Sequence, residues 1–189
     1  MKTLKERILK DGRVLDGNIL KVDSFINHQV DYKLMDDIGD EIHRRFLDCK
    51  VDKVLTIETS GIPAAYSVAR KFDVPFVFAK KKVSGNIGDD LYSTEVFSYT
   101  KSCLYNVVVS KKYLTQGENV LVVDDFLANG QAALGMIDLV EQSGANVVGV
   151  VALIEKAFQD GGNILREKGY RLEALASIEK MDVEGIKIK

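Results

Sequence analysis

Residues 120–140 read VLVVDDFLANGQAALGMIDLV and place two adjacent acidic residues directly after an apolar run. The run has the composition of a buried strand, and helical spacing of apolar residues resumes at about 131–143. Between the two, Asn129-Gly130 predicts a tight turn, because both residue types tolerate a left-handed backbone. A strand that is apolar on both faces needs neighbouring strands and covering helices, which the rest of the chain must supply.

Strand and helix patterns alternate along the 189 residues. Helices are expected at 3–11, 32–46, 62–72, 131–143 and 162–168. Strands are expected at 74–81, 102–110, 119–125, 146–156 and 172–178, and another runs from 53 into a turn at Ser60-Gly61. Asp31 is placed to cap the second helix, and residues 17–33 are expected to form an extended segment and a loop. This alternation predicts an α/β fold with a mostly parallel central sheet flanked by helices.

The composition suits one globular domain. Hydrophobic residues make up 46% and charged residues 29%, and the net charge of -2 gives no global electrostatic reason to bind nucleic acid. The charged N-terminus lacks the apolar core of a signal peptide, and no stretch approaches the ~18 apolar residues of a membrane span. Cys49 and Cys103 form no spaced motif. We therefore expect reduced thiols and a cytoplasmic protein, with no nucleic-acid or membrane partner.

Polar residues gather where the predicted strands end. Glu58, Asp124, Asp125 and Lys156 all fall at carboxyl ends, the edge where parallel sheets bind ligands. The first N–H groups of the 131–143 helix, together with Gly130, form a cradle for a phosphate. Carboxylates beside such a cradle suit sugar hydroxyls or a divalent cation, which predicts a phosphorylated sugar. The alternative is that both aspartates only cap the helix and solvate the strand end.

The stretch has no GKS or GKT and no GxGxxG, so it is neither a P-loop nor a dinucleotide fingerprint. VLVVDDFLANGQA, residues 120–132, instead resembles the phosphoribosyl pyrophosphate signature of the type I phosphoribosyltransferases. GNILKVDSFINHQVD, ETSGIPAAYSVA and EKAFQDGG extend the likeness along the chain, towards the bacterial xanthine branch of that family. Asn129 and Ala132 depart from the general pattern, because many relatives carry hydroxyl residues there.

The resemblance implies transfer of 5-phosphoribosyl from 5-phospho-α-D-ribose 1-diphosphate (phosphoribosyl pyrophosphate) to N9 of xanthine, a step of purine salvage. The products would be xanthosine 5′-monophosphate and pyrophosphate. It also implies Mg²⁺ carried by the pyrophosphate substrate, no metal site of the protein's own, and a homodimer. The expected organisation is a single domain, 1–189, with a hood formed mainly by about 1–35 and the C-terminal segment. Another purine specificity (guanine, hypoxanthine or adenine) and a non-catalytic sensor of phosphoribosyl pyrophosphate remain alternatives.

The resemblance also assigns roles to individual residues. Asp124 and Asp125 are the catalytic carboxylates that hold the ribose hydroxyls. Phosphoribosyl pyrophosphate is bound by the segment Ala128, Asn129, Gly130, Gln131 and Ala132, by the turn Thr59, Ser60 and Gly61, and by Lys81. The connection at 81–100 corresponds to a lid over the site. The resemblance assigns four residues to xanthine. Leu20 packs on the ring, and Asn27 offers its amide to the oxo-purine edge. Lys156 donates a hydrogen bond to O6, and Phe158 stacks on the base.

Overall fold

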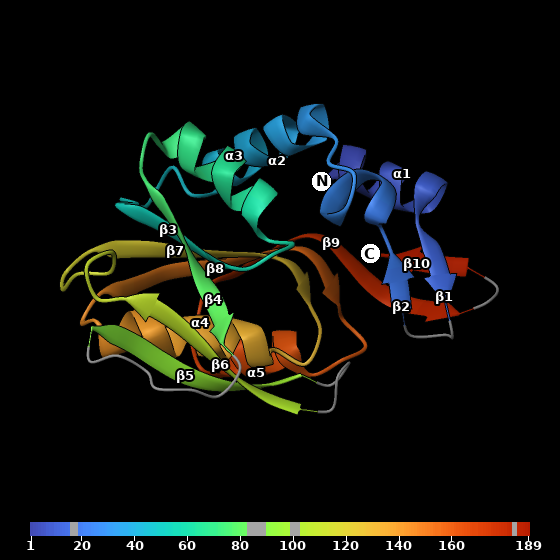
Figure 1. Cartoon of the computed structure of the whole chain (residues 1–189). Helices are drawn as coiled ribbons and strands as arrows, with labels where there is room; N and C mark the ends of the chain where they lie inside the picture. The colour runs from blue at the N-terminus through green and yellow to red at the C-terminus, as the bar shows by residue number, and fades with distance from the viewer. Residues whose placement is uncertain (16–18, 83–89, 99–102, 183–184) are drawn as a thin grey trace.

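The computed structural model describes residues 1–15, 19–82, 90–98, 103–182 and 185–189 (Figure 1). The elements, in chain order, are α1 (Lys2–Asp11), β1 (Arg13–Leu15), β2 (Ile19–Lys21), a π-helical turn η1 (Asp23–Asn27), α2 (Tyr32–Arg45), β3 (Lys53–Ile57), α3 (Ile62–Phe72), β4 (Phe76–Lys82), β5 (Leu91–Ser98), β6 (Cys103–Ser110), β7 (Asn119–Leu127), α4 (Gln131–Gln142), β8 (Asn146–Lys156), α5 (Gly161–Glu167), β9 (Leu172–Asp182) and β10 (Gly185–Ile188).

The described residues form a sheet of eight strands in the order β10-β9-β8-β7-β3-β4-β6-β5, beside the small hairpin β1-β2. The five strands from β9 to β4 pair in parallel, while β10, β6 and β5 join antiparallel. All five residues of β3 are buried, as a strand covered on both faces requires. The expected α/β fold with a mostly parallel sheet is confirmed.

Helices cover both faces of this sheet (Figure 1). α2 and α3 lie on one face, and α4 and α5 lie on the other. Asp31 caps α2 as predicted, since its Oδ1 accepts from the N–H groups of Lys33 and Leu34, both at 3.2 Å. α2 and α3 approach closely at Gly39, where an added Cβ would lie 2.8 Å from the carbonyl oxygen of Ser67. The helices thereby bury the apolar faces of the strands that carry the carboxyl-edge residues.

The structure corrects three local predictions. β7 does not end at 125 but continues to Leu127, because Phe126 and Leu127 still pair with β8. Residues 17–33 were expected to form an extended segment and a loop; β2 is extended as expected, but Asp23–Asn27 forms the π-helical turn η1. The last strand runs on to Asp182 and β10 follows it, which the sequence pattern did not predict.

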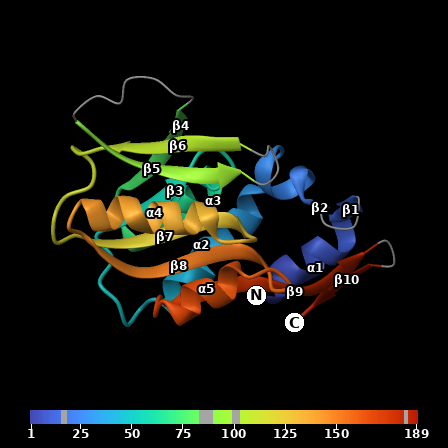
Figure 2. The same cartoon turned by 90° about the horizontal axis from the view of Figure 1, so that it is seen from below.

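Parts of the 81–100 connection are described and parts are not. Residues 81–82 end β4, and Leu91–Ser98 form β5, which pairs with β6 along its whole length (Figure 2). Residues 83–89 and 99–100 lie outside the described residues, so the lid expected at 81–100 stays a prediction. Cys103 opens β6 with an exposed thiol, and Cys49 lies half-buried beyond α2.

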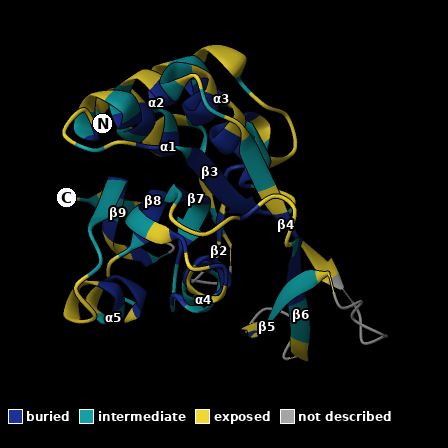
Figure 3. Cartoon of the chain, turned by 90° about the vertical axis from the view of Figure 1, so that its left-hand side faces the viewer, coloured by how far each residue is buried: buried dark blue, intermediate teal, exposed yellow. Residues whose placement is uncertain are grey.

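The N-terminal elements pack beside the C-terminal strands (Figure 1). Leu4 and Ile8 of α1 are fully buried in the same cluster as residues of β8 and β9. The Lys5 ammonium donates to the carbonyl oxygen of Lys189, which joins the two ends of the chain. Figure 3 shows β3 as buried along its length, whereas β9 is of mixed burial. No helix in the described ranges is long and apolar enough to cross a membrane.

Candidate active site

The two aspartates of β7 lie at the carboxyl edge of the parallel strands, as predicted. Asp124 is 8% exposed, and Asp125 is half-buried. The backbone N–H of Asp125 donates to Asp124 Oδ1 at 3.0 Å. Asn27 of η1 donates from Nδ2 to Asp125 Oδ2 at 3.4 Å, so residues 98 positions apart in sequence meet here. The fold therefore brings a carboxamide of the N-terminal segment to the carboxylate pair.

The surroundings of the pair disfavour negative charge. Burial raises the pKa of Asp124 well above its usual range, and the neighbouring Asp125 charge raises it further. Burial also raises the pKa of Asp125, while hydrogen bonds with Asp124 and Asn27 act in the opposite direction. Oxygens held this way can accept hydrogen bonds from neutral donors, and two adjacent hydroxyls of a sugar provide them.

The tight turn and the helix start predicted for the phosphate segment are both present. Gly130 has φ 84°, a left-handed backbone suited to glycine, and immediately precedes α4. No side chain in the described part of the structure caps α4, so its first N–H groups face the turn. The residues on either side of Gly130 are all half-buried: Ala128, Asn129, Gln131 and Ala132. An uncapped helix start behind a left-handed glycine is suited to bind an anion.

The turn at residues 58–61 follows β3 and contacts the carboxylates through Gly61. An added Cβ at Gly61 would lie 2.1 Å from Thr56 Oγ1 and 3.1 Å from Asp124 Oδ1, so only glycine fits between them. The Glu58 side chain accepts from the backbone N–H of Lys81 at 2.6 Å, which fixes this turn against β4. The turn, the lysine and the carboxylates therefore lie in one place, as the resemblance implied.

The base-side residues come from two further elements. Lys156 ends β8, its ammonium lies 5.8 Å from the centre of the Phe126 ring, and burial lowers the pKa of Lys156. Phe158 is 39% exposed in the loop before α5. Leu20 is buried on β2 near Gly12. Among the contacts that the structure describes, none joins Leu20 or Phe158 to the carboxylates.

Several neighbours of the site were missed by sequence reasoning. Thr56 is fully buried, and its Oγ1 has no hydrogen-bond partner among the described residues. Tyr105 of β6 lies under the Lys81 ammonium at 5.5 Å, and burial together with the Asp124 charge raises its pKa. Neither residue carries a local signal, because Thr and Tyr are ordinary strand residues. The Gly161-Gly162 pair did carry one, since adjacent glycines often mark close backbone approaches.

A buried carboxylate, a left-handed glycine and an uncapped helix start thus lie at the carboxyl edge of the sheet, an arrangement suited to a phosphorylated sugar. The model of the phosphoribosyl transferase domain matches residues 22–163, and the chain belongs to that family. The family predicted from the 120–132 stretch is thus confirmed.

Individual relatives narrow the comparison. The chain is 53% identical to the xanthine phosphoribosyltransferase of Clostridioides difficile (strain 630) over 100% of both chains. It is 52% identical to the enzyme of the same name from Ruminiclostridium cellulolyticum over 96% of both. Among solved structures, adenine phosphoribosyltransferase from Saccharomyces cerevisiae superposes with a TM-score of 0.74 at 21% identity, over 93% of this chain and 99% of that one. The last similarity concerns the fold alone.

The raised pKa values predict that the site opposes folding. A carboxyl whose pKa rises on folding destabilises the native state once it is ionised, by about 1.4 kcal/mol per unit of rise. The variant Asp124→Asn/Asp125→Asn should therefore be more stable than the parent at pH 7 to 8. The gain should shrink as the pH falls and vanish below about 4, the ordinary carboxyl value. Urea unfolding across this pH range measures it.

The exposed Asp37→Asn serves as the control and should change stability by less than about 0.5 kcal/mol throughout. A double variant that is no more stable than the parent at pH 8 would contradict the raised pKa values.

Proposed function

We propose that this chain transfers 5-phosphoribosyl from phosphoribosyl pyrophosphate to N9 of xanthine, giving xanthosine 5′-monophosphate and pyrophosphate. The observation that carries the proposal is the carboxylate pair of Asp124, which is buried, and Asp125, which is half-buried, beside the uncapped start of α4. Relatives named xanthine phosphoribosyltransferase, 52% and 53% identical over nearly whole chains, support the choice of base. Purine salvage is the corresponding role.

The reaction breaks the bond between the anomeric carbon and pyrophosphate oxygen, and the electron pair leaves with pyrophosphate. A bond from purine N9 to that carbon forms in its place. Asp124 and Asp125 accept hydrogen bonds from the ribose hydroxyls and hold the ring. The 128–132 segment binds the 5′-phosphate, while Thr59, Ser60, Gly61 and Lys81 bind the pyrophosphate. Catalysis then consists mainly of positioning and charge stabilisation.

The purine base contacts a different set of residues from those that bind the ribose, the 5′-phosphate and the pyrophosphate. Asn27 supplies an amide to the oxo-purine edge, Lys156 donates to O6, Phe158 stacks on the ring, and Leu20 packs behind it. Ala128 provides neither acid nor base near N7. Xanthine needs neither group, because it ionises near neutral pH and can attack as the anion.

Mg²⁺ is proposed to arrive with the pyrophosphate substrate. The described residues contain no group of three or more His, Cys, Asp or Glu side chains placed to hold a metal ion. A substrate with a diphosphate group supplies the oxygen ligands that Mg²⁺ prefers. When bound, the ion neutralises charge that develops on the leaving pyrophosphate.

We further propose one domain, 1–189, with a hood built mainly by about 1–35 and the C-terminal segment. The support is the packing of α1 against the sheet and the Asn27–Asp125 hydrogen bond, which brings η1 to the site. A cytoplasmic location is consistent with two free cysteines, as in a reducing compartment.

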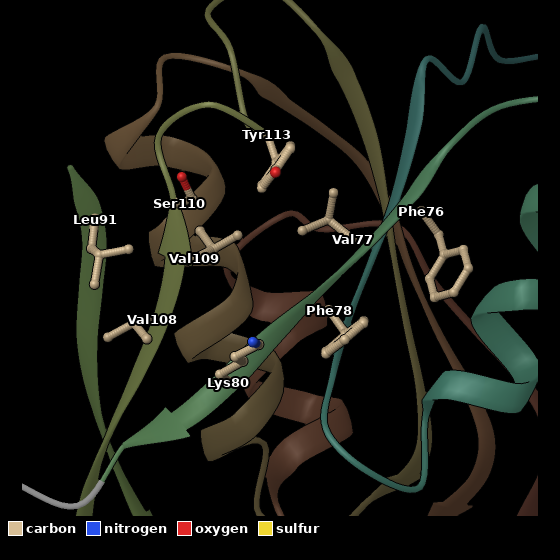
Figure 4. A pocket seen from close by; sticks show the side chains of 9 residues that line it. All are labelled: Phe76, Val77, Phe78, Lys80, Leu91, Val108, Val109, Ser110 and Tyr113. Atoms are coloured by element: carbon tan, nitrogen blue, oxygen red, sulfur yellow. The ribbon is translucent and has the colours of Figure 1, made fainter.

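A homodimer is also proposed, with the outer face of β4, β5 and β6 as its interface. This face carries a cavity of ≈ 490 Å³ lined by apolar side chains that include Phe78, Val108 and Leu91 (Figure 4). Leu104 of β6 is 63% exposed and Phe97 of β5, which pairs with it, is 37% exposed. Because α4 packs against the opposite face of β5, a second copy of the chain is the occupant that would bury these residues.

A steady-state comparison of xanthine, guanine, hypoxanthine and adenine with phosphoribosyl pyrophosphate and Mg²⁺ tests the function. The expected result is the highest kcat/KM for xanthine. Asp124→Asn/Asp125→Asn should lower kcat with xanthine by at least about a hundredfold in a folded protein, because the ribose is no longer positioned. Binding of phosphoribosyl pyrophosphate without turnover of any base would indicate a sensor instead.

Asn27→Ala tests the base site. Loss of a polar partner for xanthine should raise the KM for xanthine by about tenfold, and that for phosphoribosyl pyrophosphate by less than about threefold. The exposed neighbour His28→Ala is the matched control and should leave both values unchanged. Equal rises in the two KM values would place Asn27 on the sugar side through its contact with Asp125.

Leu104→Glu tests the interface. A charge on the apolar face proposed as the interface should shift the protein from dimer to monomer in sedimentation experiments, by at least about a tenfold rise in the dimer Kd. Leu47→Glu, whose parent side chain is 68% exposed on another face, should leave the dimer intact. A wild-type monomer at micromolar concentration would refute the proposal.

A further inference from the structure

The two glycines that open α5 touch different parts of the site. Gly161 and Gly162 are both buried and directly follow the loop 157–160, which carries Phe158. Gly161 donates its N–H to the carbonyl oxygen of Ala128 at 3.1 Å. An added Cβ at Gly161 would lie 2.4 Å from that oxygen and 2.5 Å from the nitrogen of Gly130. Only glycine therefore allows this backbone to lie against the phosphate segment.

The contact is reciprocal. A Cβ on Gly130 would lie 3.0 Å from the Cα of Gly161, so the two backbones meet with no side chain between them. Such a contact leaves little freedom for one loop to move without the other. Residues 156–160 lead from the end of β8 to Gly161. This short segment carries the proposed base contacts Lys156 and Phe158, and Gly161 joins it to the proposed phosphate contacts.

Gly162 packs closely against the buried Glu155 of β8. A Cβ at Gly162 would lie 2.0 Å from Glu155 Oε1, and Glu155 is only 3% exposed. The Glu155 carboxylate forms an ion pair with Arg166 of α5 at 2.8 Å and accepts from Ser177 Oγ of β9 at 3.0 Å. A buried carboxylate with a partner for each oxygen thus fixes α5 to the end of β8 and to the middle of β9.

We propose that Gly161 is a positioning residue that fixes the distance between the purine loop 156–160 and the 5′-phosphate segment 128–132. This inference rests on the proposed function, because it assigns the two loops to the two ends of a nucleotide. Binding of a purine nucleoside 5′-monophosphate should depend on this distance, because the ligand must reach both loops at once. Ribose 5-phosphate reaches the phosphate segment and the carboxylates but has no base to reach the purine loop.

Calorimetric titration of Gly161→Ala with xanthosine 5′-monophosphate and with ribose 5-phosphate tests the inference. The added methyl group separates the loops, so the nucleotide Kd should rise at least fivefold more than the ribose 5-phosphate Kd. With both substrates saturating, kcat should fall by at least about tenfold, because N9 and the anomeric carbon are misaligned. Proportional weakening of both ligands would show a purely local effect on the phosphate segment and would overturn the inference.

Asn163→Ala is the matched control, since Asn163 is exposed in the same helix. It should leave both Kd values and kcat within about twofold of wild type. A Gly→Ala change that acts only through helix propensity stabilises a helix by about 0.5–1 kcal/mol. A more stable Gly161→Ala protein with unchanged nucleotide affinity would therefore also overturn the inference.

Arg166→Gln covers the case in which Gly161→Ala does not fold. It weakens the hold of Glu155 on α5 and adds no atom near the phosphate segment, so it should weaken the nucleotide more than ribose 5-phosphate as well. An equal effect on the two ligands would overturn the inference. Wild-type protein that transfers phosphoribosyl to none of the four purines would refute the proposed function itself, a result distinct from a wild-type enzyme whose glycine variant behaves normally.

Discussion

Burial of the Asp124 carboxyl at the carboxyl edge of β7 is the constraint on which the rest of the site depends. An ionisable group placed there raises the free energy of the folded, unliganded protein, as the direction of its pKa indicates. The fold tolerates this buried carboxyl because the two hydrophobic clusters of the core stabilise the sheet. In the proposed function, the paired hydroxyl donors of the ribose would relieve that unfavourable energy.

Close backbone approach is the second requirement, and glycines meet it at three points. Gly61 lets the 58–61 turn lie against the carboxylates, Gly130 bends the chain ahead of α4, and Gly161 lets the base loop meet that bend. Each position is filled by backbone where a side chain would hold the loops apart. Phosphate groups are recognised largely by backbone N–H groups, so bringing backbone rather than side chains to the site is what their chemistry asks for.

The sequence predicts this fold well where patterns are local. β7, the turn at Gly130 and α4 follow from an apolar run, a turn pair and helical spacing within one stretch of 21 residues. The end of β7 was placed too early because pairing with β8, not local composition, decides where it stops. η1 and β10 were missed for a similar reason, since their conformations depend on tertiary neighbours. The Asn27–Asp125 and Gly161–Ala128 contacts join segments far apart in the chain, and no periodicity encodes them.

The charge around the base loop is consistent with a purine that binds as an anion. Burial lowers the pKa of Lys156, so the charged ammonium is less favoured at this position than in water. An anionic purine beside Lys156, as proposed, would favour the charged ammonium more than a neutral purine would. Ala128 adds no carboxylate to compete for the lysine. In the proposed function, this half-buried ammonium would therefore favour xanthine, the purine that ionises near neutral pH.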